Sequence, residues 1–395
     1  MHTRVRKPYG GESAGVSQPM SENKLSMPSA DSFSYLLLVF VALSGEFPTS
    51  LVDLLPYSSD YKRKAITRLK KARWLYTYYS NHLRGLRLTA AGKRALIQFG
   101  PEPLASVLSG NGCVCLPKYD VPNRLRLHRM AEVLVTLYRS NVLVYPWEKP
   151  PVFFSQDQSK VMTISEACYY SSFEVKSIDE RASFFGSSRA TGLLLSPDLI
   201  YAIYNTADGE MKWEYASELR LKVFMEQDLC HQQLSYHYSQ VTPAAIVFGR
   251  DMQQSITLLS GKRNNRKPFV LGNQFDHFYY LTLDHHGELL LPLLCSNERK
   301  AKFDQYLLSD FSPRRNYLME NDGFDDNGRP VLLAYTCDIP RIYSFFTGLE
   351  ISDMTGVMIC FDYQENVLRE ICGNRVSFIH IDSEEYERSV FHQPL

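Results

Sequence analysis

The chain has 395 residues and a mass of 45.4 kDa, and at roughly 100–200 residues per domain this predicts two or three domains. Hydrophobic residues make up 45% of the chain and charged residues 22%, which excludes a fully disordered, collagen-like or coiled-coil protein. The formal net charge is zero, yet residues 1–110 hold 15 Lys and Arg against seven Asp and Glu, and the remainder is net acidic. A basic N-terminal quarter in a chain of zero net charge favours a polyanion-binding domain, followed by a net acidic region of a different type.

The apolar segments and the cysteines indicate a compartment. The longest apolar run near the start, Tyr35–Leu43, is far shorter than the ~20 residues that cross a bilayer, and it follows a polar leader. The eight cysteines show no CxxC spacing, which favours free thiols in a reducing compartment. We therefore expect a cytoplasmic protein with no membrane partner.

The first hundred residues change character at residue 33. Residues 1–32 are polar, without hydrophobic periodicity, and we expect a disordered tail. Caps, breakers and β-prone runs then predict helices over 34–44, 48–55, 58–74 and 90–99, with strands over 74–79 and 83–89. This order is typical of a winged helix-turn-helix domain, which we place at residues 33–99. Frequent Gly, Pro and Asn predict a linker over 100–124 that contains about one helical turn.

From residue 125 onward, helical and strand patterns alternate. They predict helices over 125–141 and 217–232 and strands over 190–196, 199–205, 211–215 and 244–248. The order helix, strand, strand, strand, helix, strand is typical of restriction-endonuclease-like nucleases, so we assign residues 125–283 to such a core. Residues 284–395 predict additional βα units. The fold class is therefore α/β and multi-domain, with a largely parallel, covered sheet.

A long acid-free stretch of cations lies within the predicted winged helix. Residues 61–94 contain eleven Lys and Arg and not one Asp or Glu. At 100° per residue, the third predicted helix carries one apolar arc of Ala65, Ile66, Leu69 and Ala72. A separate outward arc contains Arg63, Lys64, Thr67, Arg68, Lys70 and Lys71. So many uncompensated charges repel one another unless a polyanion lies opposite them.

This pattern predicts binding to double-stranded DNA, with the cationic arc entering the major groove as a recognition helix. Arg63, Thr67 and Lys71 are assigned to base edges or phosphates, and Arg84 and Arg87 to phosphates contacted from the wing. The complete predicted set is Arg63, Lys64, Thr67, Arg68, Lys70, Lys71, Arg84, Arg87, Lys93 and Arg94. A solvated helix face and a protein–protein interaction module remain alternatives, and a second copy of the chain is a further candidate partner.

A metal-dependent nuclease is the rival hypothesis. Pro197-Asp198 is followed by Glu210-Met211-Lys212, which matches the linear acid and acid-x-Lys motif of such enzymes. If strands 199–205 and 211–215 pair as a hairpin, however, Glu210 lies more than about 20 Å from Asp198, and Glu214 is the better partner. Asp198 and Glu214 would then bind Mg²⁺, with Lys212 and Glu132 as further catalytic candidates. Without nuclease activity we expect no cofactor.

The chain resembles the replication-relaxation family of plasmids and integrative mobile elements over roughly residues 33–230. The resemblance is carried by Ala65-Ile66-Thr67-Arg68-Leu69, by Leu83–Lys93, by His128–Val133 and by Pro197-Asp198. It implies an N-terminal winged helix, a nuclease-like α/β region and a DNA-linked role in replication or transfer of a mobile element. Transcriptional control through the winged helix is a further expected role. The segment Trp213-Glu214-Tyr215-Ala216 departs from a clean acid-x-Lys motif.

Overall fold

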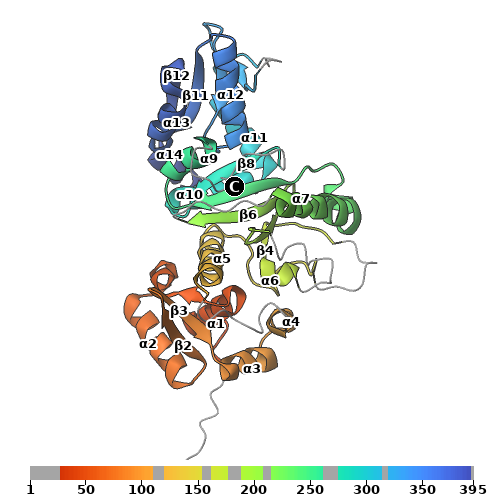
Figure 1. The fold of residues 1–395 in the computed structure, drawn as a ribbon, viewed down its shortest axis with the longest axis vertical. Coiled ribbons are helices and arrows are strands. Elements are labelled where there is room, and N and C mark those ends of the chain that lie inside the picture. The colour runs from red at the N-terminus through yellow and green to blue at the C-terminus, as the bar shows by residue number, and fades with distance from the viewer. Residues whose placement is uncertain are drawn as a thin grey trace, which may run out of the picture.

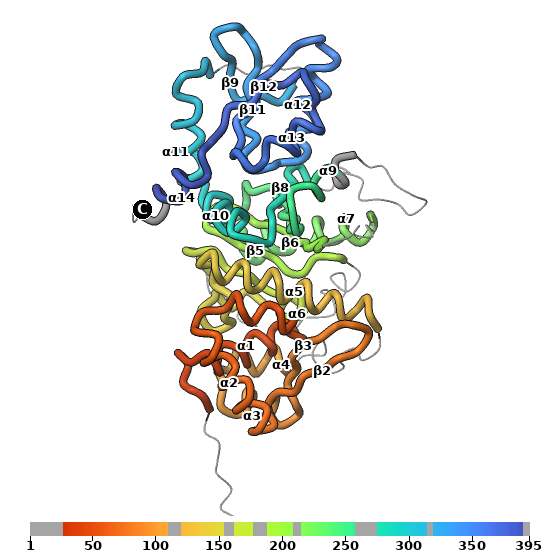
Figure 2. Tube along the Cα trace, turned by 90° about the vertical axis from the view of Figure 1, so that its left-hand side faces the viewer, coloured from red at the N-terminus to blue at the C-terminus, as the bar shows by residue number. Residues whose placement is uncertain are grey.

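The molecule consists of three tiers stacked along its long axis (Figure 1, Figure 2). The computed structural model describes residues 27–109, 120–153, 162–176, 188–207, 215–260, 275–313 and 319–392. The predicted tail, residues 1–32, lies almost entirely outside them. The N-terminal tier, at the bottom of Figure 1, holds a small sheet, and each of the other two is built around a larger sheet. This mixture of helices and strands confirms the predicted α/β class.

The N-terminal tier has the order of helices and hairpin that was predicted for residues 33–99. Its three-stranded antiparallel sheet has the order β1-β3-β2. The elements are α1 (Phe33–Ser44), β1 (Phe47–Pro48), the 3₁₀ helix η1 (Thr49–Leu54), α2 (Ser59–Lys71), β2 (Leu75–Ser80), β3 (Leu83–Leu88), α3 (Ala90–Phe99) and α4 (Glu102–Ser109).

Helix α2 presents the two faces that its periodicity predicts. Ala65 and Leu69 are buried, and Ile66 and Ala72 are half-buried against the same hydrophobic cluster. That cluster includes α1, every residue of which is buried. The apolar arc therefore anchors α2, and its polar arc faces outward.

The start of α3 depends on Thr89 and Gly92. The Thr89 hydroxyl accepts a hydrogen bond from Gly92 N at 3.0 Å and donates one to the Arg73 carbonyl, so it caps the helix and ties it to the end of α2. A Cβ atom at Gly92 would lie 2.3 Å from the Trp74 carbonyl oxygen. The Leu-Thr-x-x-Gly sequence at residues 88–92 thus has a packing reason.

Replacing Gly92 with Ala should destabilise the N-terminal tier by about 1–3 kcal/mol, because the added methyl group forces α3 away from the Trp74 backbone. Chemical denaturation of the full chain measures the change. The exposed neighbour Ala91 supplies the control, since Ala91→Ser should stay within about 0.5 kcal/mol. Equal stability of the two variants would show that the close approach is unimportant.

The predicted linker at residues 100–124 contains packed structure, which corrects that prediction. Helix α4 lies within it, with Leu104, Val107 and Leu108 buried. Helix α5 (Val121–Arg139) begins before the predicted linker ends, capped by the Asp120 carboxylate at Asn123 N. Residues 110–119 lie outside the described residues.

The middle tier is a five-stranded sheet of order β4-β5-β6-β7-β8. Strands β4, β5 and β6 are antiparallel, and β6, β7 and β8 are parallel. The sheet is therefore mixed. Strands β5 and β6 are antiparallel because the connection between them, residues 196–199, is too short for a parallel crossover. The elements are β4 (Cys168–Ser171), α6 (Ser172–Val175), β5 (Gly192–Leu195), β6 (Ile200–Ala207), α7 (Tyr215–Val223), the π-helical η4 (Phe224–Gln233), α8 (Ser235–Tyr238), β7 (Ala244–Gly249), α9 (Gln253–Ser260), β8 (Phe278–Thr282) and α10 (His285–Leu294).

The hairpin predicted between residues 199–205 and 211–215 is wrong. Strand β6 already has β5 on one side and β7 on the other, and α7 begins at Tyr215. Residues 208–214 lie outside the described residues. The geometric argument that paired Asp198 with Glu214 therefore loses its basis.

The C-terminal tier confirms the additional βα units predicted after residue 284. Strands β10, β11 and β12 are parallel, and β9 is antiparallel to β10, in the order β12-β11-β10-β9. The elements are α11 (Asn297–Leu307), β9 (Gly323–Phe324), β10 (Pro330–Leu333), α12 (Ile339–Ile351), β11 (Gly356–Phe361), the 3₁₀ turns η5 (Asp362–Gln364) and η6 (Gly373–Arg375), α13 (Glu365–Cys372), β12 (Val376–Ile381) and α14 (Ser383–His392).

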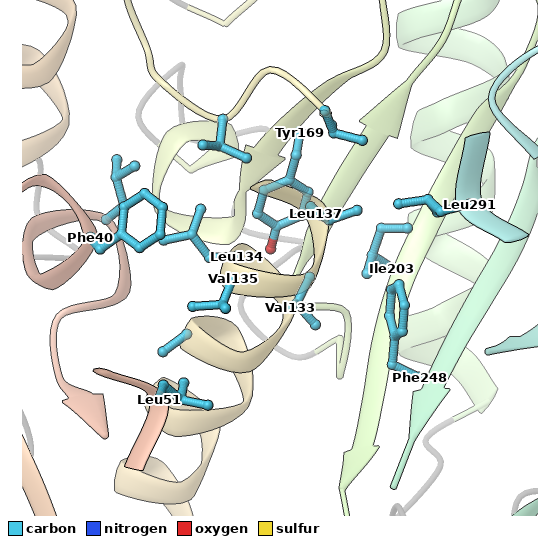
Figure 3. Packing of buried hydrophobic residues seen from close by; sticks show 14 of the residues in the cluster. Phe40, Leu51, Val133, Leu134, Val135, Leu137, Tyr169, Ile203, Phe248 and Leu291 are labelled. Atoms are coloured by element: carbon cyan, nitrogen blue, oxygen red, sulfur yellow. The ribbon is translucent and has the colours of Figure 1, made fainter. Parts of the chain in front are cut away.

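Helix α5 joins the N-terminal tier to the middle sheet (Figure 3). In one continuous hydrophobic cluster, α5 packs between Phe40 of α1 and Leu51 of η1 on one side and Ile203 of β6 and Phe248 of β7 on the other. The two tiers therefore share a core, and α5 fixes the position of one relative to the other.

Candidate nucleic-acid interface

The outward face of α2 is cationic and exposed. The exposed side chains on it are Arg63, Lys64, Thr67, Arg68, Lys70 and Lys71. One acid lies beside them, because Arg63 Nη2 contacts Asp60 Oδ1 at 2.9 Å in a highly exposed pair. An ion pair this exposed contributes little and leaves both groups available to a ligand.

The β2–β3 hairpin extends this face. Arg84 on β3 is exposed and lies opposite Tyr79 on β2, whose side chain is 64% exposed. Partial burial and the neighbouring charge of Arg84 lower the pKa of Lys70, so α2 and the hairpin bring their cations close together. We call Arg63, Lys64, Arg68, Lys70, Lys71 and Arg84 the cationic surface. On α3, Arg94 is exposed and Lys93 half-buried.

Two cations of the acid-free stretch are buried, and one of them corrects a prediction. Arg87, assigned to a phosphate contact, is only 2% exposed. Its guanidinium lies inside the tier because β1 pairs with β3 and places Glu46 beside it. Lys62 is also buried, and its ammonium group donates to the carbonyls of Val52, Asp53 and Leu55 at the end of η1.

Glu46 is the centre of a buried charged cluster. Its carboxylate is fully buried and accepts hydrogen bonds from Arg87 Nη2 at 2.5 Å and Arg124 Nη2 at 2.5 Å. The imidazole Nε2 of His128 lies 3.0 Å from Glu46 Oε1. We call Glu46, Arg87, Arg124 and His128 the Glu46 cluster. It joins the turn after α1, the hairpin and α5, and its two guanidinium groups outnumber its single carboxylate.

The Glu46 cluster also holds the tip of the hairpin. Arg124 donates from Nη1 to the Ser80 carbonyl at 2.7 Å and from Nη2 to the Leu83 carbonyl at 3.1 Å, on either side of the turn. The Tyr78 ring lies near both guanidinium groups, 4.2 Å from that of Arg87 and 4.6 Å from that of Arg124. The hairpin is thus fixed to α5, and through α5 to the sheet.

The predicted metal-site residues do not come together in the described part of the chain. Asp198 precedes the amino end of β6, where its carboxylate accepts a hydrogen bond from Asn297 N at 3.1 Å. Glu132 accepts one from Asn205 Nδ2 at 2.9 Å, near the other end of the strand. At ~3.3 Å per residue these positions are roughly 20 Å apart. A site shared by Asp198 and Glu132 is therefore excluded, while Glu214 and Lys212 lie outside the described residues.

Glu132 has an environment of its own. Burial raises the pKa of this carboxyl, although the hydrogen bond from Asn205 and the charges of Arg250, His128 and Arg129 act in the opposite direction. Across the described ranges, no group of three or more His, Cys, Asp or Glu side chains could hold a metal ion.

Sequence reasoning missed the Glu46 cluster. The one available signal was that Glu46 is the sole acid between Asp31 and Asp53, in a strongly apolar stretch, where a charge has to be paired. Its partners Arg124 and His128 follow about eighty residues later, one helical turn apart, and nothing in their spacing points to Glu46.

Comparisons with known proteins give no further assignment. No protein-family model matches the chain, and neither a curated protein nor a solved structure matches it significantly. Within the ranges that the structure covers, we find no helix with the length and apolar character needed to traverse a bilayer.

Proposed function

We propose that this protein binds double-stranded DNA through a winged-helix unit, with α2 as the recognition helix and the β2–β3 hairpin as the wing. The observation that carries the proposal is the cationic surface, where six exposed Lys and Arg from two elements adjoin. Within the described ranges, Asp60 is the one acid that forms an ion pair with them. An exposed helix with its apolar arc anchored in the tier can enter a major groove.

The two elements support different contacts. Side chains near the middle of α2, such as Thr67 and Lys71, are candidates for base edges, because a helix in the groove presents its outward face to them. Arg84 on the hairpin suits a phosphate contact, which fixes orientation without reading sequence. The Glu46 cluster supports this division because it holds the hairpin in one position relative to α5.

Binding of a labelled random 20-base-pair duplex, followed by anisotropy as KCl rises from 50 to 300 mM, tests the proposal. With about six phosphates neutralised, the logarithm of the association constant should fall with the logarithm of salt at a slope near −5. Absence of binding at 50 mM KCl, or a slope close to zero, would reject it. Salt-independent self-association in place of DNA binding would instead support a protein–protein interaction module.

A Mg²⁺-dependent nuclease is the less supported candidate. The described elements follow the expected order of a nuclease-like core only when β4 replaces the predicted strand over 211–215 and the short helix α6 is left out. In addition, Asp198 accepts a hydrogen bond from Asn297 N and Glu132 accepts one from Asn205. We therefore propose the α/β region as a nuclease-like body without a catalytic role. A role in replication or transfer of a mobile element remains the expectation that the family resemblance implies, and transcriptional control remains the expectation that a winged helix implies.

A further inference from the structure

A second group of cations lies away from the cationic surface, where α5 crosses α6 and the start of β5. The Ser172 hydroxyl on α6 lies 3.6 Å from Met130 Sδ on α5, and Ser172 N donates to the Thr191 carbonyl at 2.8 Å. Arg126 lies one helical turn before Met130, and Lys176 one turn after Ser172. Both side chains therefore flank the same contact.

A third cation joins them from the segment that precedes β5. Arg126 Nη2 donates to the Ser188 carbonyl at 3.3 Å, and Arg189 follows directly. Arg126 and Lys176 are half-buried and Arg189 is exposed. Helix α5, the end of α6 and the segment before β5 thus bring three positive charges together.

Among the described residues, the acid beside this group is Glu218, and it does not pair with Arg126 or Lys176. Glu218 is fully buried and accepts hydrogen bonds from the Ser188 hydroxyl at 2.7 Å, the Tyr204 hydroxyl at 2.8 Å and Arg189 N at 2.8 Å. No ion pair joins Arg126 or Lys176 to a carboxylate of the described residues.

The charges repel one another. Burial and then the charge of Arg126 lower the pKa of Lys176 to about 8. Burial and the charge of Arg189 also lower the pKa of Arg126, although Glu218 acts against this change. A bound anion would relieve this repulsion, and a multiply charged one would relieve it most.

We propose that Arg126, Lys176 and Arg189 form a second anion-binding site, separate from the cationic surface, that takes a phosphate group. Two guanidinium groups and an ammonium group match a tetrahedral oxyanion, because the guanidinium fork pairs with two oxygens and the ammonium acts as a point charge. The phosphate comes either from a free phosphate-bearing molecule or from a nucleic-acid backbone, and the experiment distinguishes these sources.

The rate at which an amine-reactive ester acetylates Lys176 in the full chain at pH 8, measured by mass spectrometry, tests the site. Inorganic phosphate should lower the acetylation rate of Lys176 at least five-fold and leave the rate of Lys302 on α11 unchanged. KCl of equal ionic strength should lower neither rate. Protection by a duplex without terminal phosphates identifies the backbone as the source, and protection by inorganic phosphate alone identifies a small molecule. Equal effects of phosphate and KCl, or no effect of phosphate and duplex, would overturn the proposal.

Two variants complete the experiment. Arg126→Gln should abolish the protection of Lys176, and protection that persists in the folded variant would contradict the assignment. If Arg126→Gln does not fold, the ³¹P line width of inorganic phosphate provides a second test. The wild-type protein should broaden this line by binding phosphate, and Lys176→Gln should not. The variant Arg68→Ala/Lys71→Ala/Arg84→Ala should retain phosphate protection, which separates failure of this site from failure of the proposed DNA surface.

Discussion

The triple variant Arg68→Ala/Lys71→Ala/Arg84→Ala should bind a random duplex roughly 10²–10³-fold more weakly than the wild type at 0.1 M salt. Each phosphate contact releases about 0.9 counterion, so three lost contacts reduce the salt slope by about 2.7. All three side chains are exposed and unlinked to the Glu46 cluster, so the thermal stability of the protein should hardly change. Anisotropy titrations over a range of KCl concentrations give both quantities.

A matched control lies on two helices far from α2. Arg299 and Lys302 of α11 and Arg388 of α14 are also exposed, and α11 and α14 lie in the upper part of the fold, away from α2 (Figure 1). Replacing all three with Ala removes the same net charge. This control should bind within about three-fold of the wild type, and an equal loss in both triple variants would mean that net charge, rather than the cationic surface, determines affinity.

Replacing Glu46 with Ala should lower the free energy of unfolding by about 3–5 kcal/mol, because Arg87 and Arg124 would remain buried without their carboxylate. Asp60→Ala also breaks an Arg–carboxylate ion pair, but this pair is exposed. The substitution should therefore lower the free energy of unfolding by less than about 1 kcal/mol. Urea denaturation of the two variants compares them. Similar losses would show that the Glu46 cluster contributes no more than a surface pair.

The same carboxylate predicts a dependence on pH. Burial alone would raise the pKa of Glu46, but hydrogen bonds from His128, Arg124 and Arg87 outweigh it and lower the pKa from 4.5 to about 2. A lowered pKa stabilises the fold at pH values above about 4.5, and this contribution, about 3 kcal/mol, is lost as the pH falls toward 2. The ¹³C resonance of the Glu46 carboxyl should titrate near pH 2, and a midpoint near 4.5 would disprove the cluster's role.

The N-terminal tier could be predicted largely from local patterns. The apolar and cationic arcs of α2 follow from its own periodicity, so the burial of Ala65 and Leu69 and the exposure of Arg68 and Lys71 were predicted. The hairpin and the start of α3 follow from short-range signals such as Thr89. In these segments, residues close in sequence determine the structure.

Several predictions were wrong where residues far apart in the sequence determine burial or strand pairing. Arg87 resembles the other cations of its stretch, but a partner 41 residues earlier in the chain draws it inside. In the predicted linker, Leu104 and Leu108 of α4 carry a helical spacing that nearby Gly and Pro obscured. Asp198 was paired with Glu214 on the strength of a hairpin between residues 199–205 and 211–215, but β6 has β5 and β7 as its neighbours.

The location of bound DNA tests the central claim most directly. Acetylation of every lysine can be followed with and without a saturating random duplex at 50 mM KCl. Contact through the cationic surface predicts strong protection of Lys64, Lys70 and Lys71 on α2, with Lys300 and Lys302 on α11 modified at unchanged rates. Unchanged modification of the three α2 lysines in the bound complex would contradict DNA binding through this surface.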